Sequence, residues 1–145
     1  GDIVYCRGTE TLAAPIDFDT NSGNLNPGYI KFIGCNGSGT VDGTFFVLDG
    51  NSAAANCIRG VTTAQTYLWF ENMEFKNATG NGVESIAGCD YWGFVNCIAH
   101  NNGAHGFDCD YLDYCIFFGC RAYSNTNTGF YASAYTPDQA WICCV

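Results

Sequence analysis

The chain of 145 residues carries a formal net charge of −9 at pH 7, and 48% of its residues are hydrophobic while only 13% are charged. Its five Lys and Arg are scattered, so no basic stripe exists and an electrostatic basis for nucleic-acid binding is excluded. No apolar run approaches the length of a membrane span and no signal segment opens the chain, so no membrane partner is predicted.

Short stretches with the character of β-strands recur along the chain. Residues 69–75, 93–99 and 116–122 alternate large apolar residues with polar or small ones, as half-buried strands do. Clusters rich in Gly and Asn follow these stretches at 77–82, 101–103 and 124–129. Gly and Asn tolerate left-handed backbone conformations, so the clusters predict tight corners between strands.

These stretches belong to an internal repeat. Met73, Cys97, Cys120 and Cys144 recur at a nearly constant step, about 24 residues each time. A coil of this length, with two or three short strands and sharp corners, is the unit of a parallel β-helix. We therefore predict one all-β domain over residues 1–145, a right-handed parallel β-helix of about six coils. Two apolar columns keep the same step: Phe70, Phe94, Phe117 and Trp141, and Ile58, Val83, Phe107 and Phe130.

The repeat also predicts how the chain ends and how its corners are held. Residues 141–145 match the opening strand of a further coil, whereas solenoids normally end in atypical capping repeats. We therefore expect a fragment of a longer solenoid, or an uncapped subunit whose open edges join copies end to end.

The repeat also stacks Asn72 on Asn96, and Asn77 on Asn101. These pairs predict ladders of side-chain amides at the corners.

Ten cysteines indicate an oxidising, extracellular compartment. Stacked coils would bring Cys97 and Cys120 about 5 Å apart, within disulfide reach. A column of small buried thiols fits the same pattern, so both states of this pair remain open. Cys6 and Cys35 form a second candidate disulfide. A zinc site is disfavoured because the chain has no CxxC pair.

Acidic residues gather on one predicted sheet face. If the column that contains Val83 points inward, the residue after each member points outward. These outward residues are Arg59, Glu84, Asp108 and Tyr131, and Asp110 follows two residues later. Three alternatives remain open for this face. In the first, Arg59 pairs with Glu84 and the Asp residues are merely solvated. In the second, the carboxylates of Glu84, Asp108 and Asp110 bind Ca²⁺. In the third, two of these carboxylates act as acid and base on a glycosidic bond.

Aromatic residues near the corners are candidates for surface binding, because rings with polar tips suit sugar stacking or a protein interface. Trp92, Tyr111 and Tyr131 are the candidates for carbohydrate contact. The residues near corners are Tyr91, Trp92, Tyr111, Tyr114, Tyr123 and Tyr135.

Three segments resemble the pectate-lyase-like superfamily of β-helix proteins. Residues 1–12 and 29–37 look like strands of that fold, and residues 96–108 are similar to the calcium-binding coil of the family 9 polysaccharide lyases. The resemblance implies an enzyme in which calcium bridges the protein and a uronic-acid substrate, while a basic side chain removes a proton.

The chain departs from that family at the residues that carry the chemistry. Ala104 and His105 stand where the family has an Asp pair, which leaves Asp108 from the motif. No Lys follows Lys76, so the family's basic residue is missing. Arg121 is the candidate base, because an arginine serves this role in related lyases.

Two functions are therefore predicted. The first is a secreted protein that binds, and in lyase fashion cleaves, an acidic or neutral polysaccharide along the face bearing Glu84 and Asp108. Neutral glycans fit the acidic chain better, unless calcium bridges the two partners. The alternative is a structural or adhesive β-helix without catalysis, such as a spike or filament subunit. The sequence leaves enzymatic activity open.

Overall fold

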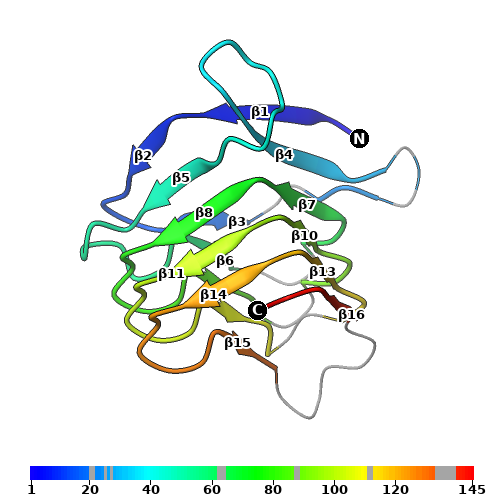
Figure 1. Cartoon of the computed structure of the whole chain (residues 1–145). Coiled ribbons are helices and arrows are strands. Elements are labelled where there is room, and N and C mark those ends of the chain that lie inside the picture. Colours follow the sequence, from blue (N-terminus) through cyan, green and yellow to red (C-terminus); the bar gives the residue numbers. More distant parts are fainter. Residues whose placement is uncertain are drawn as a thin grey trace.

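The chain winds into stacked coils of short parallel strands (Figure 1). The computed structural model describes residues 1–19, 22–24, 26, 28–61, 65–86, 89–110, 113–132 and 140–145. Within these residues there is no helix, so none that could cross a membrane. Each strand pairs in parallel with its equivalent in the next coil, which confirms the predicted parallel β-helix.

Three sheets form the walls of the solenoid. The first sheet contains β1 (Ile3–Arg7), β4 (Ile30–Cys35), β7 (Leu68–Glu71), β10 (Gly93–Val95), β13 (Ile116–Phe118) and β16 (Ala140–Ile142). The second sheet contains β2 (Thr9–Thr11), β5 (Phe46–Asp49), β8 (Met73–Lys76), β11 (Ile98–His100) and β14 (Arg121–Tyr123). The third sheet contains β3 (Ile16–Phe18), β6 (Ile58–Gly60), β9 (Val83–Glu84), β12 (Phe107–Asp108) and β15 (Phe130–Tyr131).

The number of turns differs from the prediction. The regular solenoid has about four turns rather than six. In the first sheet, Ile3 pairs with Lys31 and Lys31 pairs with Trp69, and both steps along the chain are longer than the repeat. The register keeps the constant step of the repeat only from Trp69 onward, beginning with the pairing of Trp69 and Gly93. Because the N-terminal coils are longer, the same chain length makes fewer turns.

Two columns of stacked phenylalanines fill the core. Phe70, Phe94 and Phe117 stack face to face, with ring centroids 5.1 and 4.9 Å apart. Phe107 and Phe130 form the facing column at 5.1 Å. The two columns meet edge to face, because the Phe94 and Phe107 centroids lie 5.5 Å apart at an angle of 67°. These members of the predicted apolar columns therefore point inward, and strand register stacks their rings.

Residues with left-handed backbone form the corners. Between the first and second sheets these are Asn72, Asn96, Gly119 and Cys143, with φ between 49° and 63°. The predicted Gly and Asn clusters lie at the corner after the second sheet, and each begins with a left-handed residue, as predicted: Asn77, Asn101 and Ser124 have φ of 56°, 55° and 53°. The corner before the first sheet is different, because it uses tyrosines, which the sequence did not indicate. These are Tyr67, Tyr91 and Tyr114, with φ of 58°, 58° and 54°.

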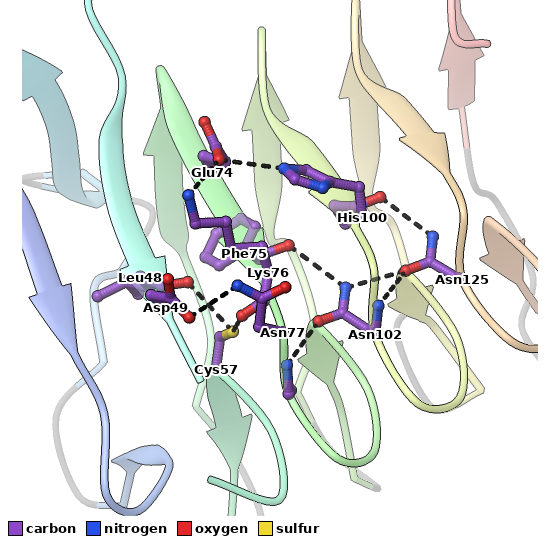
Figure 2. Close-up of polar contacts among 12 residues, drawn as sticks. Leu48, Asp49, Cys57, Glu74, Phe75, Lys76, Asn77, His100, Asn102 and Asn125 are labelled. Atoms are coloured by element: carbon purple, nitrogen blue, oxygen red, sulfur yellow. Dashed lines mark hydrogen bonds and ion pairs between the residues drawn. The ribbon is translucent and has the colours of Figure 1, made fainter. Parts of the chain in front are cut away.

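Amide ladders hold two of the corners. The Asn96 side chain donates to the Asn72 side chain at 2.7 Å, as predicted. The predicted contact between Asn77 and Asn101 is replaced by another, because Asn77 Nδ2 donates to Asp49 Oδ1 at 3.0 Å. The amide ladder lies one residue further on, at Asn102, whose Nδ2 donates to Asn125 Oδ1 in the next coil at 3.0 Å (Figure 2).

All ten cysteines are free thiols, so neither candidate disulfide is present. Cys97 and Cys120 lie one coil apart, and each thiol donates to a backbone carbonyl, that of Phe70 for Cys97 and that of Phe94 for Cys120. Cys97 and Cys120 are therefore small buried side chains that donate to strand carbonyls of the preceding coil. For the other pair, the register offsets the two residues, because Cys6 pairs with Gly34 while Cys35 pairs with Arg7.

Candidate functional site on the outward face of the third sheet

A column of ionisable side chains runs up the outward face of the third sheet. Strand register stacks Asp17, Arg59, Glu84, Asp108 and Tyr131, one from each of β3, β6, β9, β12 and β15. The predicted position of Glu84 beside Asp108 is thus confirmed, at a strand spacing of about 4.8 Å. We call these five residues the acidic column.

Arg59 neutralises one end of the acidic column. Its Nε and Nη2 donate to the two carboxylate oxygens of Asp17, at 3.1 and 2.9 Å. This bidentate pair replaces the expected pairing of Arg59 with Glu84. Asp17 was missed because the first coils break the regular repeat. Its one sequence signal is the isoleucine before it, because Ile16 precedes Asp17 as Ile58 precedes Arg59.

Two buried asparagines hold the other carboxylates in place. Asn56 Nδ2 donates to Glu84 Oε2 at 2.8 Å, and Asn81 Nδ2 donates to Asp108 Oδ2 at 3.0 Å. The asparagines are themselves fixed, because Asn56 Oδ1 accepts from the Asn81 backbone N–H at 2.8 Å and Asn81 Oδ1 accepts from that of His105 at 2.9 Å. The orientation of both carboxylates is therefore set by the coil backbone.

Burial and mutual repulsion alter the acidity of the pair. Burial raises the pKa of Glu84, and the neighbouring Asp108 raises it further, against the opposing effect of Arg59. Burial also raises the pKa of Asp108, although the backbone N–H of Asp110 and the nearby His105 oppose the rise. Two adjacent carboxyls that both hold protons more tightly than usual are a recurrent feature of functional sites.

An aromatic pair closes the C-terminal end of the acidic column. The His105 and Tyr131 rings stack with centroids 4.5 Å apart, and His105 Nδ1 lies 2.5 Å from Thr128 Oγ1. Tyr131 is 38% exposed. A carboxylate, an imidazole and a phenol are therefore neighbours on this face. His105, which departs from the lyase motif, therefore belongs to the site.

Two of the calcium candidates, Asp108 and Asp110, are joined through the backbone. Asp110 follows Asp108 closely, and its backbone N–H donates to Asp108 Oδ1 at 3.2 Å. Within the described part of the chain, no group of three or more His, Cys, Asp and Glu side chains is arranged to hold a metal ion. Calcium binding by Glu84, Asp108 and Asp110 therefore remains a prediction.

The remaining predicted residues do not join the acidic column. Arg121 lies in β14 of the second sheet, so the candidate base and the carboxylates are on different walls of the solenoid. Trp92 is 1% exposed and its Nε1 donates to the backbone oxygen of Gln65 at 2.6 Å. Its ring fills the core and offers no surface to a sugar, which corrects that prediction. Tyr111 lies outside the described residues.

A second polar cluster lies on the outward face of the second sheet (Figure 2). Glu74 Oε1 lies 3.2 Å from Lys76 Nζ and 3.0 Å from His100 Nε2. The His100 ring also stacks on Tyr123 at 4.8 Å. Glu74 joins the Lys76 and His100 side chains across neighbouring strands, whereas His100 Nδ1 is buried and makes no hydrogen bond to the described residues. We regard the cluster as a partly buried polar network.

Comparisons with family models, with curated proteins and with solved structures find no match to this chain. The fold and the site together define it as a parallel β-helix protein whose third sheet carries a row of half-buried carboxylates. The relation to pectate-lyase-like proteins is not supported by any relative.

The carboxyl pair makes the stability of the protein depend on pH. Because the native pKa values of Glu84 and Asp108 are raised, their favourable contribution is complete below the ordinary carboxyl pKa of about 4 and is lost as pH rises through the native values. We expect wild type to lose stability relative to a Glu84→Gln/Asp108→Asn variant above about pH 4. Urea unfolding at several pH values measures this, with Glu74→Gln as control. Parallel pH curves for wild type and the double variant would contradict it.

Proposed function

We propose that the protein is a secreted, pectate-lyase-like β-helix that binds an uncharged polysaccharide along the acidic column. The observation that supports this most directly is the pairing of Glu84 with Asp108, with Tyr131 next in the same column. The carboxylates and the aromatic ring follow each other at one strand spacing, which is comparable to the size of one sugar ring.

The chemistry of this face suits sugar hydroxyls. Each carboxylate has about four acceptor positions, and the asparagine amides occupy only part of them. Glu84 and Asp108 can therefore accept further hydrogen bonds from a ligand without giving up their supports. Tyr131 and His105 add an apolar surface with polar edges.

We propose an uncharged glycan as the partner because the protein is strongly negative. The chain has a net charge of −9, and the column itself contains three carboxylates and one guanidinium. An anionic glycan would be repelled, unless a divalent cation came between the two partners. The proposal is limited to binding, because Arg121, the candidate base, lies on a different sheet from the carboxylates.

Binding to immobilised neutral polysaccharides tests this function. Asp108→Asn and Glu84→Gln remove hydrogen-bond acceptors that carry charge, so we expect each to weaken binding about tenfold, which is about 1.4 kcal/mol. The matched control is Glu74→Gln, which removes an equivalent outward carboxylate from the second sheet and should leave affinity unchanged.

Two further arms of the experiment separate the alternatives. Binding to polygalacturonate that appears only with Ca²⁺ and vanishes with chelator would favour the calcium-bridged acidic glycan. Unsaturated product released from that polymer would establish a lyase. Equal affinity of wild type and both variants for every glycan would refute binding along the acidic column.

A further inference from the structure

The outward face of the first sheet is an apolar surface. Its strands point one set of side chains into the core and the alternate set toward solvent. Among the described residues, the outward set has three charged members, Lys31 and Glu71 within the sheet and Arg7 at the corner end of β1. The apolar members that are more than a third exposed are Ile3 51%, Tyr5 58%, Tyr114 47%, Ile116 42%, Phe118 50% and Ile142 45%. We call this surface the apolar face.

The aromatic side chains of the apolar face are held in fixed positions. Tyr67, Tyr91 and Tyr114 stack on one another, with centroids 4.6 and 5.0 Å apart and planes within 11°. Trp69 occupies the space above Gly93, where a Cβ would collide with its ring. Rigid side chains lose little conformational entropy on association, so the surface is prepared for contact.

The stacking also limits what the surface can bind. The Tyr91 ring is covered on both faces, by Tyr67 on one side and by Tyr114 on the other. Sugar stacking needs an open ring face, which the middle ring does not have. The other exposed residues are three isoleucines, Phe118 and Tyr5, and side chains of these types are suited to packing against protein side chains. The apolar face therefore fits a protein partner better than a glycan.

Charge permits a second copy of this chain as the partner. Copies with a net charge of −9 repel each other, so they can meet only at a wall without a concentration of like charge. The described strands of the apolar face carry one carboxylate, Glu71, against the positive Lys31 and Arg7. The third sheet is excluded because its described strands hold Asp17, Glu84 and Asp108 against Arg59 alone. The outward charges of the second sheet balance, and its wall differs from the apolar face in having fewer exposed apolar side chains.

The area matches the requirement of a stable contact. At about 200 Å² for a fully exposed large side chain, the six exposed residues present roughly 600 Å². The partly buried members, which include Ile33, Trp69 and Val95, bring the surface toward about 800 Å² per partner, the size of a standard interface. Isolated apolar patches of this size on monomers are uncommon.

The N-terminal edge of the solenoid is less suited to association. In the second sheet, register places Glu10 of β2 in the column that continues with Leu48, Phe75 and Ala99. A charged residue at an inward position of an edge strand opposes the addition of another strand. This observation argues against docking of copies end to end through this edge.

We propose that two copies of this chain associate side by side through the apolar face of the first sheet. The acidic columns of both copies then stay exposed on other walls, so a pair offers two glycan sites to one polymer. Two linked sites bind a repeating ligand more tightly than one does. The association itself does not depend on glycan binding.

Sedimentation over a range of protein concentrations tests the association. We expect wild type to form dimers, and Phe118→Lys to raise the dimer dissociation constant at least tenfold, because it places a charge in the centre of an apolar contact. Tyr123→Lys is the matched control, since Tyr123 is also 50% exposed but lies on the second sheet; this variant should dimerise like wild type. Circular dichroism shows whether each variant is folded, and Ile142→Lys provides a second disruption of the face.

Two outcomes would overturn the inference. One is a wild type that stays monomeric up to about 100 µM, which means a contact too weak for a specific dimer. The other is association that survives both Phe118→Lys and Ile142→Lys, because the copies would then meet elsewhere. Unchanged binding of a short neutral oligosaccharide by monomeric Phe118→Lys would separate this interface from the proposed function, because such a ligand occupies one site and gains nothing from a pair.

Discussion

Replacing Phe94 with alanine is expected to lower the free energy of unfolding by about 3–5 kcal/mol. Phe94 is fully buried and stacks between Phe70 and Phe117, while its ring edge meets Phe107. Removing it opens a cavity bounded by neighbouring coils that strand pairing holds in place, so the walls cannot collapse to fill it. Urea denaturation followed by circular dichroism measures the loss.

The control for this prediction is Phe118→Ala. This variant also removes a phenylalanine ring, but Phe118 points outward from the next coil and is half exposed. At protein concentrations low enough to keep the chain monomeric, it should cost less than about 1 kcal/mol. A similar loss for both variants would mean that burial in the phenylalanine column is not what stabilises the coils.

Replacing Asn102 with leucine is expected to cost about 2–4 kcal/mol, because several buried polar groups lose their partners together. Asn102 is 2% exposed, its Oδ1 accepts from the Ala78 N–H at 3.1 Å, and its Nδ2 donates to the Phe75 carbonyl at 3.3 Å (Figure 2). Leucine fills a similar volume but satisfies none of these groups. Urea unfolding measures the loss, and hydrogen exchange should show reduced protection of the Ala78 amide.

Asn101→Gly is the matched control for the ladder. Asn101 is exposed and has a left-handed backbone with φ of 55°, which glycine adopts freely. We expect its stability to stay within about 0.5 kcal/mol of wild type. If Asn102→Leu were equally mild, ordered water or a shifted backbone would have to satisfy the Ala78 N–H.

Much of the fold could be predicted because a β-helix repeats its local rules. The alternation in residues 93–99 predicts a strand, and the repeat predicts that Phe94 stacks on Phe70. The turn count failed in the N-terminal half, where the coils that contain β1 and β4 are longer and the constant period is lost. Tyrosines in the left-handed corner were also missed, because propensity alone assigns such positions to Gly and Asn.

The candidate site was predictable only where it follows the repeat. Glu84 and Asp108 are one period apart, and strand pairing makes them neighbours. Asp17, which takes the guanidinium of Arg59, lies in an irregular coil, so no periodic pattern connects the two residues. Trp92 was wrongly predicted to lie at the surface. Its position near a corner suggested exposure, but its side chain turns into the core.

By itself, the sequence determined that the chain coils into parallel strands and which residues stack in columns, because a constant repeat period acts through local strand and corner preferences. The tertiary structure alone decided the contacts that the repeat does not describe, such as those of Arg59 with Asp17 and of Trp92 with the Gln65 carbonyl. Those contacts join residues from different coils, at separations such as the 42 residues between Asp17 and Arg59. They depend on the actual length of each coil and on which wall a side chain faces, and neither is encoded in the residues next to it.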